Sequence, residues 1–279
     1  MRELAIGPPP AALSSVYTGR SLLTWTTSSC APACYLGIAA EEAYPVNILF
    51  SGPMSLVHPV VLEDSGINTL ADIKGKTVSL PGGRVTSNTI FFRALQNYYG
   101  WTSDDVREIE YVSPAEMTRS MIEGIVDMGL VGGAPPHPSV VELESSEEVR
   151  FLSVDDDFMD YVIKYAFDEH SQTYERGTLP PNTYEGQTEA VNLLAEGHIY
   201  ICRPDVDEHV AYTLVKTLFD NEEELETMLP AGYAINLESA LGSHVVPYHP
   251  GAVKYYKERG VWTAEHEAKQ AEVLEKLAE

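Results

Sequence analysis

The stretch that most constrains the fold is residues 78–90, where an apolar run passes through Pro81, Gly82 and Gly83 into a helical pattern. A strand that ends here and continues as a helix near Thr86 directs free backbone N–H groups and the positive end of a helix dipole toward one point. The stretch lacks the lysine of a Walker loop and the third glycine of a dinucleotide fingerprint. It therefore predicts a seat for a small carboxylate rather than for a nucleotide, although such turns also occur without ligands in α/β domains.

A second apolar run, residues 127–131, leads into another glycine-rich turn at residues 132–138. Between the two turns, the pattern predicts a helix over 86–99, a strand over 108–112 and a helix over 113–124. Strands that alternate with amphipathic helices are typical of parallel sheets covered on both faces, which bind ligands at the carboxyl ends of their strands. The sequence therefore predicts an α/β fold of mostly parallel sheets with helices on both faces.

The remaining pattern predicts further elements on both sides of this region. Strands are expected at 21–27, 46–50, 55–62, 151–153, 191–193 and 199–201, and the pattern loosens into loop over 167–186. Helices are expected at 31–42, 69–74, 155–166, 205–218, 221–228, 250–260 and 263–276.

The charge balance excludes two classes of partner. The 279 residues include 18 basic and 42 acidic side chains, for a net charge of −24. Nucleic acid and anionic membrane surfaces would repel such a chain. The acidity is consistent either with a salt-rich habitat or with a heavily solvated face.

The cysteines and the apolar runs exclude several other features. Cys30, Cys34 and Cys202 are too few for a disulfide framework, and Cys30 with Cys34 is too small a set for a metal. We therefore expect no metal and no cofactor. No run of 18 apolar residues predicts insertion into a membrane, and the N-terminal residues do not form a secretion signal. The protein is then either cytoplasmic or preceded by residues upstream of Met1.

Four motifs in order resemble a known family. They are DSGINTLADIKGKTV at 64–78 followed by the Pro81 turn, DMGLVGGAPPHPSV at 127–140, LPPNTYEGQ at 179–187, and PYHPGAVKYYKERG at 247–260. Together they are similar to the TAXI family, the TRAP-associated extracytoplasmic immunogenic solute-binding proteins. The resemblance extends from about residue 21 to residue 260.

The resemblance implies a periplasmic-binding-protein-like fold of type II, with two lobes and a cleft between them. Residues 1–76 and 188–279 would form lobe 1, and residues 77–187 would form lobe 2. Such a protein is exported, captures a small organic acid or an acidic, glutamate-like amino acid, and delivers it to TRAP-type membrane subunits without catalysis. The candidate ligand-binding residues are Thr26, Thr27, Ser28, Gly82, Gly83, Arg84, Val85, Thr86, Gly132, Gly133 and Tyr184. Thr26–Ser28 and Thr86 could instead cap helices, and Tyr184 could simply pack.

The chain departs from the family pattern in two places. The family's opening glycine-rich strand and its Gly-Ser-x-Glu-Asn-x-Arg-Leu-Leu element are not intact, so the first lobe is expected to be truncated. The central turn has Gly82-Gly-Arg-Val85 where the family has Gly-Ser-Gly-Thr. Arg84 could replace the lost hydroxyl donors with a bidentate clamp on a carboxylate, or it could be a solvated loop cation.

Two alternatives to a binding protein stay open. An enzyme on the same two-lobed scaffold would need a base and a partner, for which His137 and Asp127 are the candidates. The other alternative is an inert truncated fragment that binds nothing.

The role of Arg84 can be tested directly. If its guanidinium forms a desolvated pair with the ligand, Arg84→Ala will weaken acid binding by roughly 10-fold to 100-fold in calorimetric titration. Affinity that is unchanged in this variant would identify Arg84 as a solvated loop residue.

Overall fold

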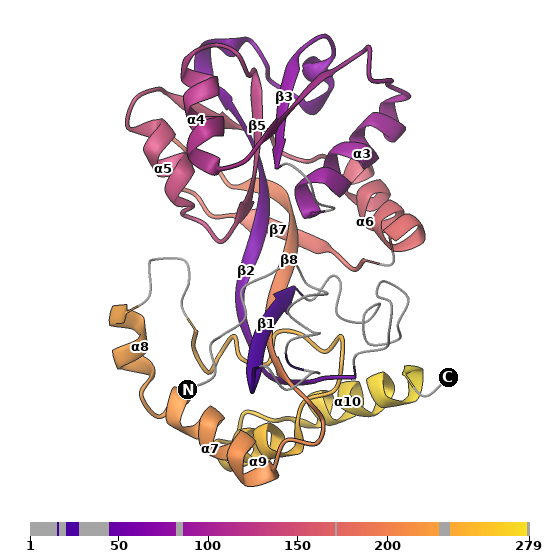
Figure 1. Ribbon diagram of the computed structural model, residues 1–279, viewed down its shortest axis with the longest axis vertical. Helices are drawn as coiled ribbons and strands as arrows, with labels where there is room; N and C mark the ends of the chain where they lie inside the picture. Colours follow the sequence, from indigo (N-terminus) through magenta and orange to yellow (C-terminus); the bar gives the residue numbers. More distant parts are fainter. Residues whose placement is uncertain are drawn as a thin grey trace. The chain divides into compact units, whose positions relative to one another are not determined.

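The computed structural model describes residue 16 and residues 21–27, 45–81, 86–170, 172–228 and 235–277. The chain forms two compact units (Figure 1). Unit 1 comprises Met1–Pro53, Ser171–Thr173 and Gly197–Glu279, and unit 2 comprises Met54–His170 and Tyr174–Glu196. These bounds differ from those of the predicted lobes, and the assignment of lobes stays a prediction. Among the described residues, no helix is both long and apolar enough to span a bilayer.

The sheet of unit 2 mixes parallel and antiparallel pairs. Strand β3 (Thr77–Pro81) lies parallel to β4 (Arg107–Tyr111) and to β5 (Met128–Gly133). Antiparallel pairs join β2 (Asn47–Leu62) to β5 and β6 (Val149–Phe151), and β7 (Glu175–Leu179) to β8 (Val191–Cys202). The α/β class is confirmed, but the expectation of mostly parallel sheets is wrong because β2 runs against β5.

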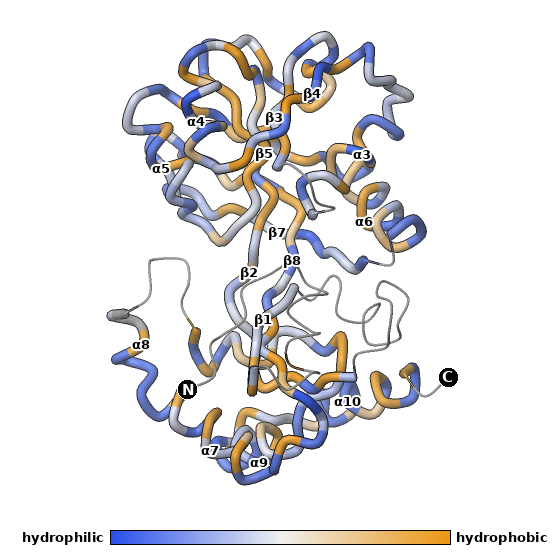
Figure 2. The backbone as a smooth tube through the Cα atoms, viewed as in Figure 1, coloured by the Kyte–Doolittle hydropathy of each residue, from blue (hydrophilic) through white to orange (hydrophobic). Residues whose placement is uncertain are grey.

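Helices cover both faces of this sheet, as predicted (Figure 1). Helices α3 (Ser87–Tyr99) and α6 (Asp156–His170) pack against each other over one core, which contains Phe91, Leu95 and Phe158. Helices α4 (Pro114–Ile122) and α5 (Pro138–Glu144) cover a second core that contains Met117 and Val140. The tube of β5 is largely apolar where it runs between these cores (Figure 2). Two short 3₁₀ helices, Glu63–Ser65 and Leu70–Ile73, precede β3.

Unit 1 contains its own core. Strand β1 (Leu23–Thr27) pairs antiparallel with the second half of β8. Its described helices include α7 (Glu208–Phe219), α8 (Glu222–Met228), α9 (Pro250–Glu258) and α10 (Ala264–Lys276). Three buried tyrosines, Tyr248, Tyr255 and Tyr256, fill the core around the first half of β2. The Tyr256 hydroxyl donates to the Leu49 carbonyl at 2.8 Å, which ties α9 to that strand.

Three of the secondary-structure predictions were wrong. Residues 46–50 and 55–62 belong to one strand, β2, because Gly52 admits the ring of Tyr200 where a side chain would collide with it. The two strands predicted near residues 191 and 201 are likewise the single strand β8. Strand β7 lies in the region predicted as loop, because its polar residues Glu175–Leu179 gain order from pairing with β8 rather than from their own propensity. The helix predicted over 31–42 lies outside the described residues.

The contact between α7 and α9 depends on Gly251. A Cβ atom at this position would lie 2.2 Å from the Glu208 carbonyl oxygen and 2.8 Å from the Tyr212 nitrogen. We expect Gly251→Ala to lower the free energy of unfolding by about 3 kcal/mol, measured by urea denaturation, because the two helices must separate. The control is Gly260→Ala, where φ is +72° and no atom lies within 4 Å of the added Cβ. Backbone strain alone should lower the free energy of unfolding of this variant by about 1 kcal/mol. Equal losses in the two variants would contradict a packing role for Gly251.

Candidate functional site

The structure describes six of the eleven predicted ligand-binding residues. Ser28, Gly82, Gly83, Arg84 and Val85 lie outside the described residues. Thr26 and Thr27 are in β1 of unit 1, where Thr26 is buried and Thr27 pairs with His198 of β8. The others, Thr86, Gly132, Gly133 and Tyr184, are in unit 2. Whether any of them contacts a ligand stays a prediction.

Thr86 begins helix α3. Its hydroxyl accepts from the Thr89 N–H at 3.4 Å, and its own N–H donates to the Thr89 hydroxyl at 2.7 Å. The capping alternative for Thr86 therefore holds. The next two N–H groups, those of Ser87 and Asn88, have no acceptor within the helix because they belong to its first turn. Their dipoles make this end of α3 attractive to an anion.

Helix α3 begins beside the carboxyl end of β5, because β3 and β5 are parallel neighbours. Asn88 links the two elements, with its Nδ2 donating to the Leu130 carbonyl at 3.2 Å. The Tyr111 hydroxyl donates to the same carbonyl at 3.0 Å. Burial raises the pKa of Tyr111 to about 12, and the hydrogen bond with Asn88 opposes this rise. The phenol is therefore neutral at physiological pH and serves as a donor.

Gly132 lies directly beside the Asn88 amide. The backbone of Gly132 is exposed, whereas Asn88 is 4% exposed. A Cβ atom at Gly132 would lie 3.0 Å from Asn88 Oδ1, which has no hydrogen-bond partner among the described residues. Periodicity identified the glycine turn and the helix, but it did not single out Asn88, whose side chain matters only because β5 lies beside it.

Gly133 and Tyr184 lie in a neighbouring aromatic cluster. A Cβ atom at Gly133 would lie 2.5 Å from His137 Cδ2, so any other residue would force the His137 ring to shift. The Tyr184 hydroxyl accepts from the His137 N–H at 2.6 Å, and its ring stacks on Phe151 with centroids 4.8 Å apart. Tyr184 is 4% exposed. Its ring therefore packs inside unit 2 and fixes the turn after β5.

The residues proposed for the enzyme alternative do not meet. Asp127 precedes β5, and its carboxylate accepts from the Thr77 N–H at 2.8 Å. His137 lies past the other end of β5 and caps α5 by accepting from the Ser139 N–H. Six residues of strand separate them, a span of about 20 Å. Both side chains are occupied in holding elements together, so this geometry does not favour acid–base catalysis by the pair. Among the described residues, no cluster of three or more His, Cys, Asp or Glu could hold a metal.

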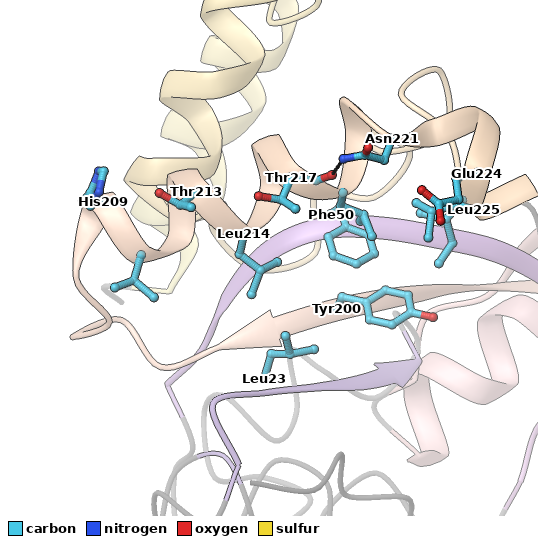
Figure 3. Close-up of a pocket in the computed structure, with 13 residues that line it drawn as sticks. Leu23, Phe50, Tyr200, His209, Thr213, Leu214, Thr217, Asn221, Glu224 and Leu225 are labelled. Carbon is cyan, nitrogen blue, oxygen red and sulfur yellow. Dashed lines mark hydrogen bonds between the residues drawn. The ribbon is translucent and has the colours of Figure 1, made fainter. Parts of the chain in front are cut away.

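Unit 1 contains a recess of about 950 Å³ between α7, α8 and the strands (Figure 3). Its floor includes Phe50 and Tyr200, whose rings stack with centroids 4.3 Å apart, and Leu214 and Leu218 of α7 form one wall. Among the described residues that line it there is no Lys or Arg, whereas Glu224 is present. An apolar recess with an acidic edge is a poor seat for a small anion.

Comparison with known proteins identifies the family to which the chain belongs. A model of the NMT1-like family matches residues 45–260, so the chain belongs to this family. The TAXI family in particular is not established by this match.

Solved structures similar to the chain include two sulphonate-binding proteins and the protein XAC2383. The periplasmic aliphatic sulphonate binding protein SsuA of Escherichia coli is 17% identical, with 95% of this chain and 80% of that chain covered and a TM-score of 0.46. The alkanesulfonate-binding protein SsuA of Xanthomonas axonopodis pv. citri, bound to MOPS, is 16% identical, with 95% and 70% covered and a TM-score of 0.40. XAC2383 of Xanthomonas citri, bound to chloride, is 12% identical, with 97% and 82% covered and a TM-score of 0.45. At these identities and scores, the likeness assigns no ligand to the chain.

Buried His58 of β2 gives a prediction of pH dependence. Its Nδ1–H donates to the Val131 carbonyl at 3.0 Å, Nε2 has no described partner, and burial lowers the pKa of His58 to about 4. The unfolded chain, with a His pKa near 6.5, binds more protons between pH 6.5 and 4, so stability falls as the pH falls through this window. We expect the loss in unfolding free energy from pH 7 to pH 5 to be about 2 kcal/mol smaller in His58→Asn than in wild type.

The comparison requires denaturation curves at both pH values. Exposed His209→Asn is the matched control and should retain the wild-type loss. If His58→Asn loses as much stability as wild type, another group governs this pH range.

Proposed function

We propose that this chain is the solute-binding subunit of a transport system, and that it captures a small organic acid or acidic amino acid at the start of α3. The observation that carries the proposal is the meeting of the α3 N-terminus with exposed Gly132, beside an Asn88 side chain that keeps one polar atom unpaired. Two N–H groups and a helix dipole attract an anion there. Membership of the NMT1-like family and the division into two α/β units support the same proposal.

The finer features of the proposal come from the TAXI resemblance. They are an extracytoplasmic location, a cleft between two lobes, and TRAP-type membrane subunits that receive the solute. Among the similar structures is the substrate binding protein of an amino acid ABC transporter. ABC-type membrane subunits are therefore the alternative partner to test beside TRAP-type subunits. No described side-chain pair favours the enzyme alternative over binding.

The class of ligand can be tested by thermal shift. An acid that binds the native state and not the unfolded chain stabilises the protein by about 2.7 kcal/mol at 100 times its dissociation constant. For a chain of this size, we expect a rise in melting temperature of about 5 °C or more with amino acids, dicarboxylates or sulfonates, and no change in the added solute. Neutral amides of the same acids are the matched controls. If no acid stabilises the protein, or if the solute is consumed, acid capture for transport is wrong.

A further inference from the structure

Helix α7 has two apolar faces, whereas a helix on the surface of a globular protein ordinarily has one. The first face is buried in the core of unit 1 and consists of Ala211, Val215 and Phe219. The second face lines the recess shown in Figure 3 and consists of Val210, Leu214 and Leu218. Val210 is 42% exposed. A bound molecule that covers this second face would remove its side chains from water and gain free energy from doing so.

The strands form the opposite wall of the recess. The rings of Phe50 and Tyr200 stack with centroids 4.3 Å apart, and Leu23 of β1 lines the recess beside them (Figure 3). The volume of about 950 Å³ is within the range of pockets that hold small organic molecules, roughly 300–1,000 Å³. None of the described candidate residues for acid binding lines this recess. It is therefore a site in addition to the acid seat at the start of α3.

The polar groups of the recess gather along one edge. Thr213, Thr217 and Asn221 recur every four residues along α7 and just past its end, and Glu224 follows in the first turn of α8 (Figure 3). Asn221 Nδ2 donates to the Thr217 carbonyl at 2.7 Å, which leaves the amide oxygen as an acceptor. The Glu224 carboxylate can only accept hydrogen bonds. This edge therefore suits a ligand group that donates.

The charge at this edge selects a cation. The first turn of α8 holds three consecutive glutamates, Glu222, Glu223 and Glu224. Lys216 of α7 and Arg259, which follows α9, both pair with Asp220. The described lining contributes no basic side chain, and the whole chain has a net charge of −24. A field of this sign attracts a cation to the recess and repels an anion.

We propose that the recess of unit 1 binds an amphipathic cation, an amine with an apolar tail. The tail lies between the second face of α7 and the stacked rings of Phe50 and Tyr200, and the ammonium group donates to Glu224. Each methylene group buried in this way raises the affinity about 4-fold. A short amine has the charge without the tail, and a fatty acid has the tail with the wrong charge. This site does not depend on acid binding by unit 2.

Three probes separate the tail from the charge. They are n-octylammonium, n-hexylammonium and n-octanoate, each titrated below its micelle concentration into the full chain in a calorimeter. We expect n-octylammonium to bind with one-to-one stoichiometry and roughly 10-fold more tightly than n-hexylammonium, because two further methylene groups are buried. We expect n-octanoate, whose tail is similar and whose charge is opposite, to bind at least 10-fold more weakly than n-octylammonium.

Three variants locate the site. Thr217 is exposed and lines the recess, so the ring in Thr217→Phe should occupy the space of the tail and weaken n-octylammonium binding at least 10-fold. Glu224→Gln should weaken it about 2-fold to 5-fold, because an exposed ion pair is lost. The matched control is Glu223→Gln, which removes the same charge from the same turn. Glu223 is exposed and is not among the described residues that line the recess, so this variant should bind as wild type does.

The melting temperature shows whether each variant folds as wild type does. If Thr217→Phe melts earlier, the two glutamate variants decide, since both change only an exposed side chain. Equal effects in Glu224→Gln and Glu223→Gln overturn the proposal, because the amine would then respond to charge in general. Binding of n-octylammonium that persists in a folded Thr217→Phe also overturns it.

Two further results would overturn the proposal. One is binding of n-octanoate as tight as that of n-octylammonium. The other is a lack of n-octylammonium binding to wild type, the result expected where a protein segment rather than a small molecule covers α7. Acid binding is measured separately by thermal shift, so either proposal can fail while the other stands.

Discussion

The parallel pairing of β3 with β5 is the interaction on which the candidate site depends. It aligns Val78 with Met128 and so brings together the ends of two strands that lie about 50 residues apart in the sequence. Helix α3 then begins beside the glycines that end β5, and Asn88 can reach the Leu130 carbonyl. The Asp127 carboxylate bonds to the Thr77 N–H and holds the same register at the opposite end of the pair. Without this register, the free N–H groups, the exposed glycine and the buried amide would be unrelated features of three segments.

The sequence predicted the elements of this arrangement better than their connections. Apolar periodicity placed α3, α4 and β5 within a few residues, because each has a clear apolar stripe or a capping residue. It failed at β7, where the polar stretch Glu175–Leu179 is a strand only because β8 lies alongside. It also divided β2 at Gly52, because a glycine and a proline are local signals of a turn and the packing of Tyr200 over Gly52 is not local. Pairing across long sequence distances cannot be derived from local patterns.

The same limit separates the predicted site residues from those that the structure brings forward. The glycines at 132 and 133 were recognised by type, but their neighbours differ, since Gly132 lies against the Asn88 amide and Gly133 accommodates the ring of His137. Tyr184 was proposed as a ligand contact, and its hydroxyl is engaged by the His137 N–H. Asn88 carries no signal in the sequence, because an Asn in the first turn of a helix is ordinary. Its importance comes from burial, from the Leu130 carbonyl and from the lack of a side chain at residue 132.

Two of the buried side-chain atoms without a described hydrogen-bond partner, Asn88 Oδ1 and His58 Nε2, belong to residues that bond to consecutive carbonyls of β5, and they differ in whether they titrate. His58 is 0% exposed and faces the rings of Phe151 and Tyr184, so its unpaired nitrogen is enclosed and responds only to protons. Asn88 Oδ1 is buried as well, although Gly132 beside it is exposed. A buried imidazole nitrogen makes stability depend on pH, whereas a buried amide oxygen does not, because an amide does not titrate in this pH range.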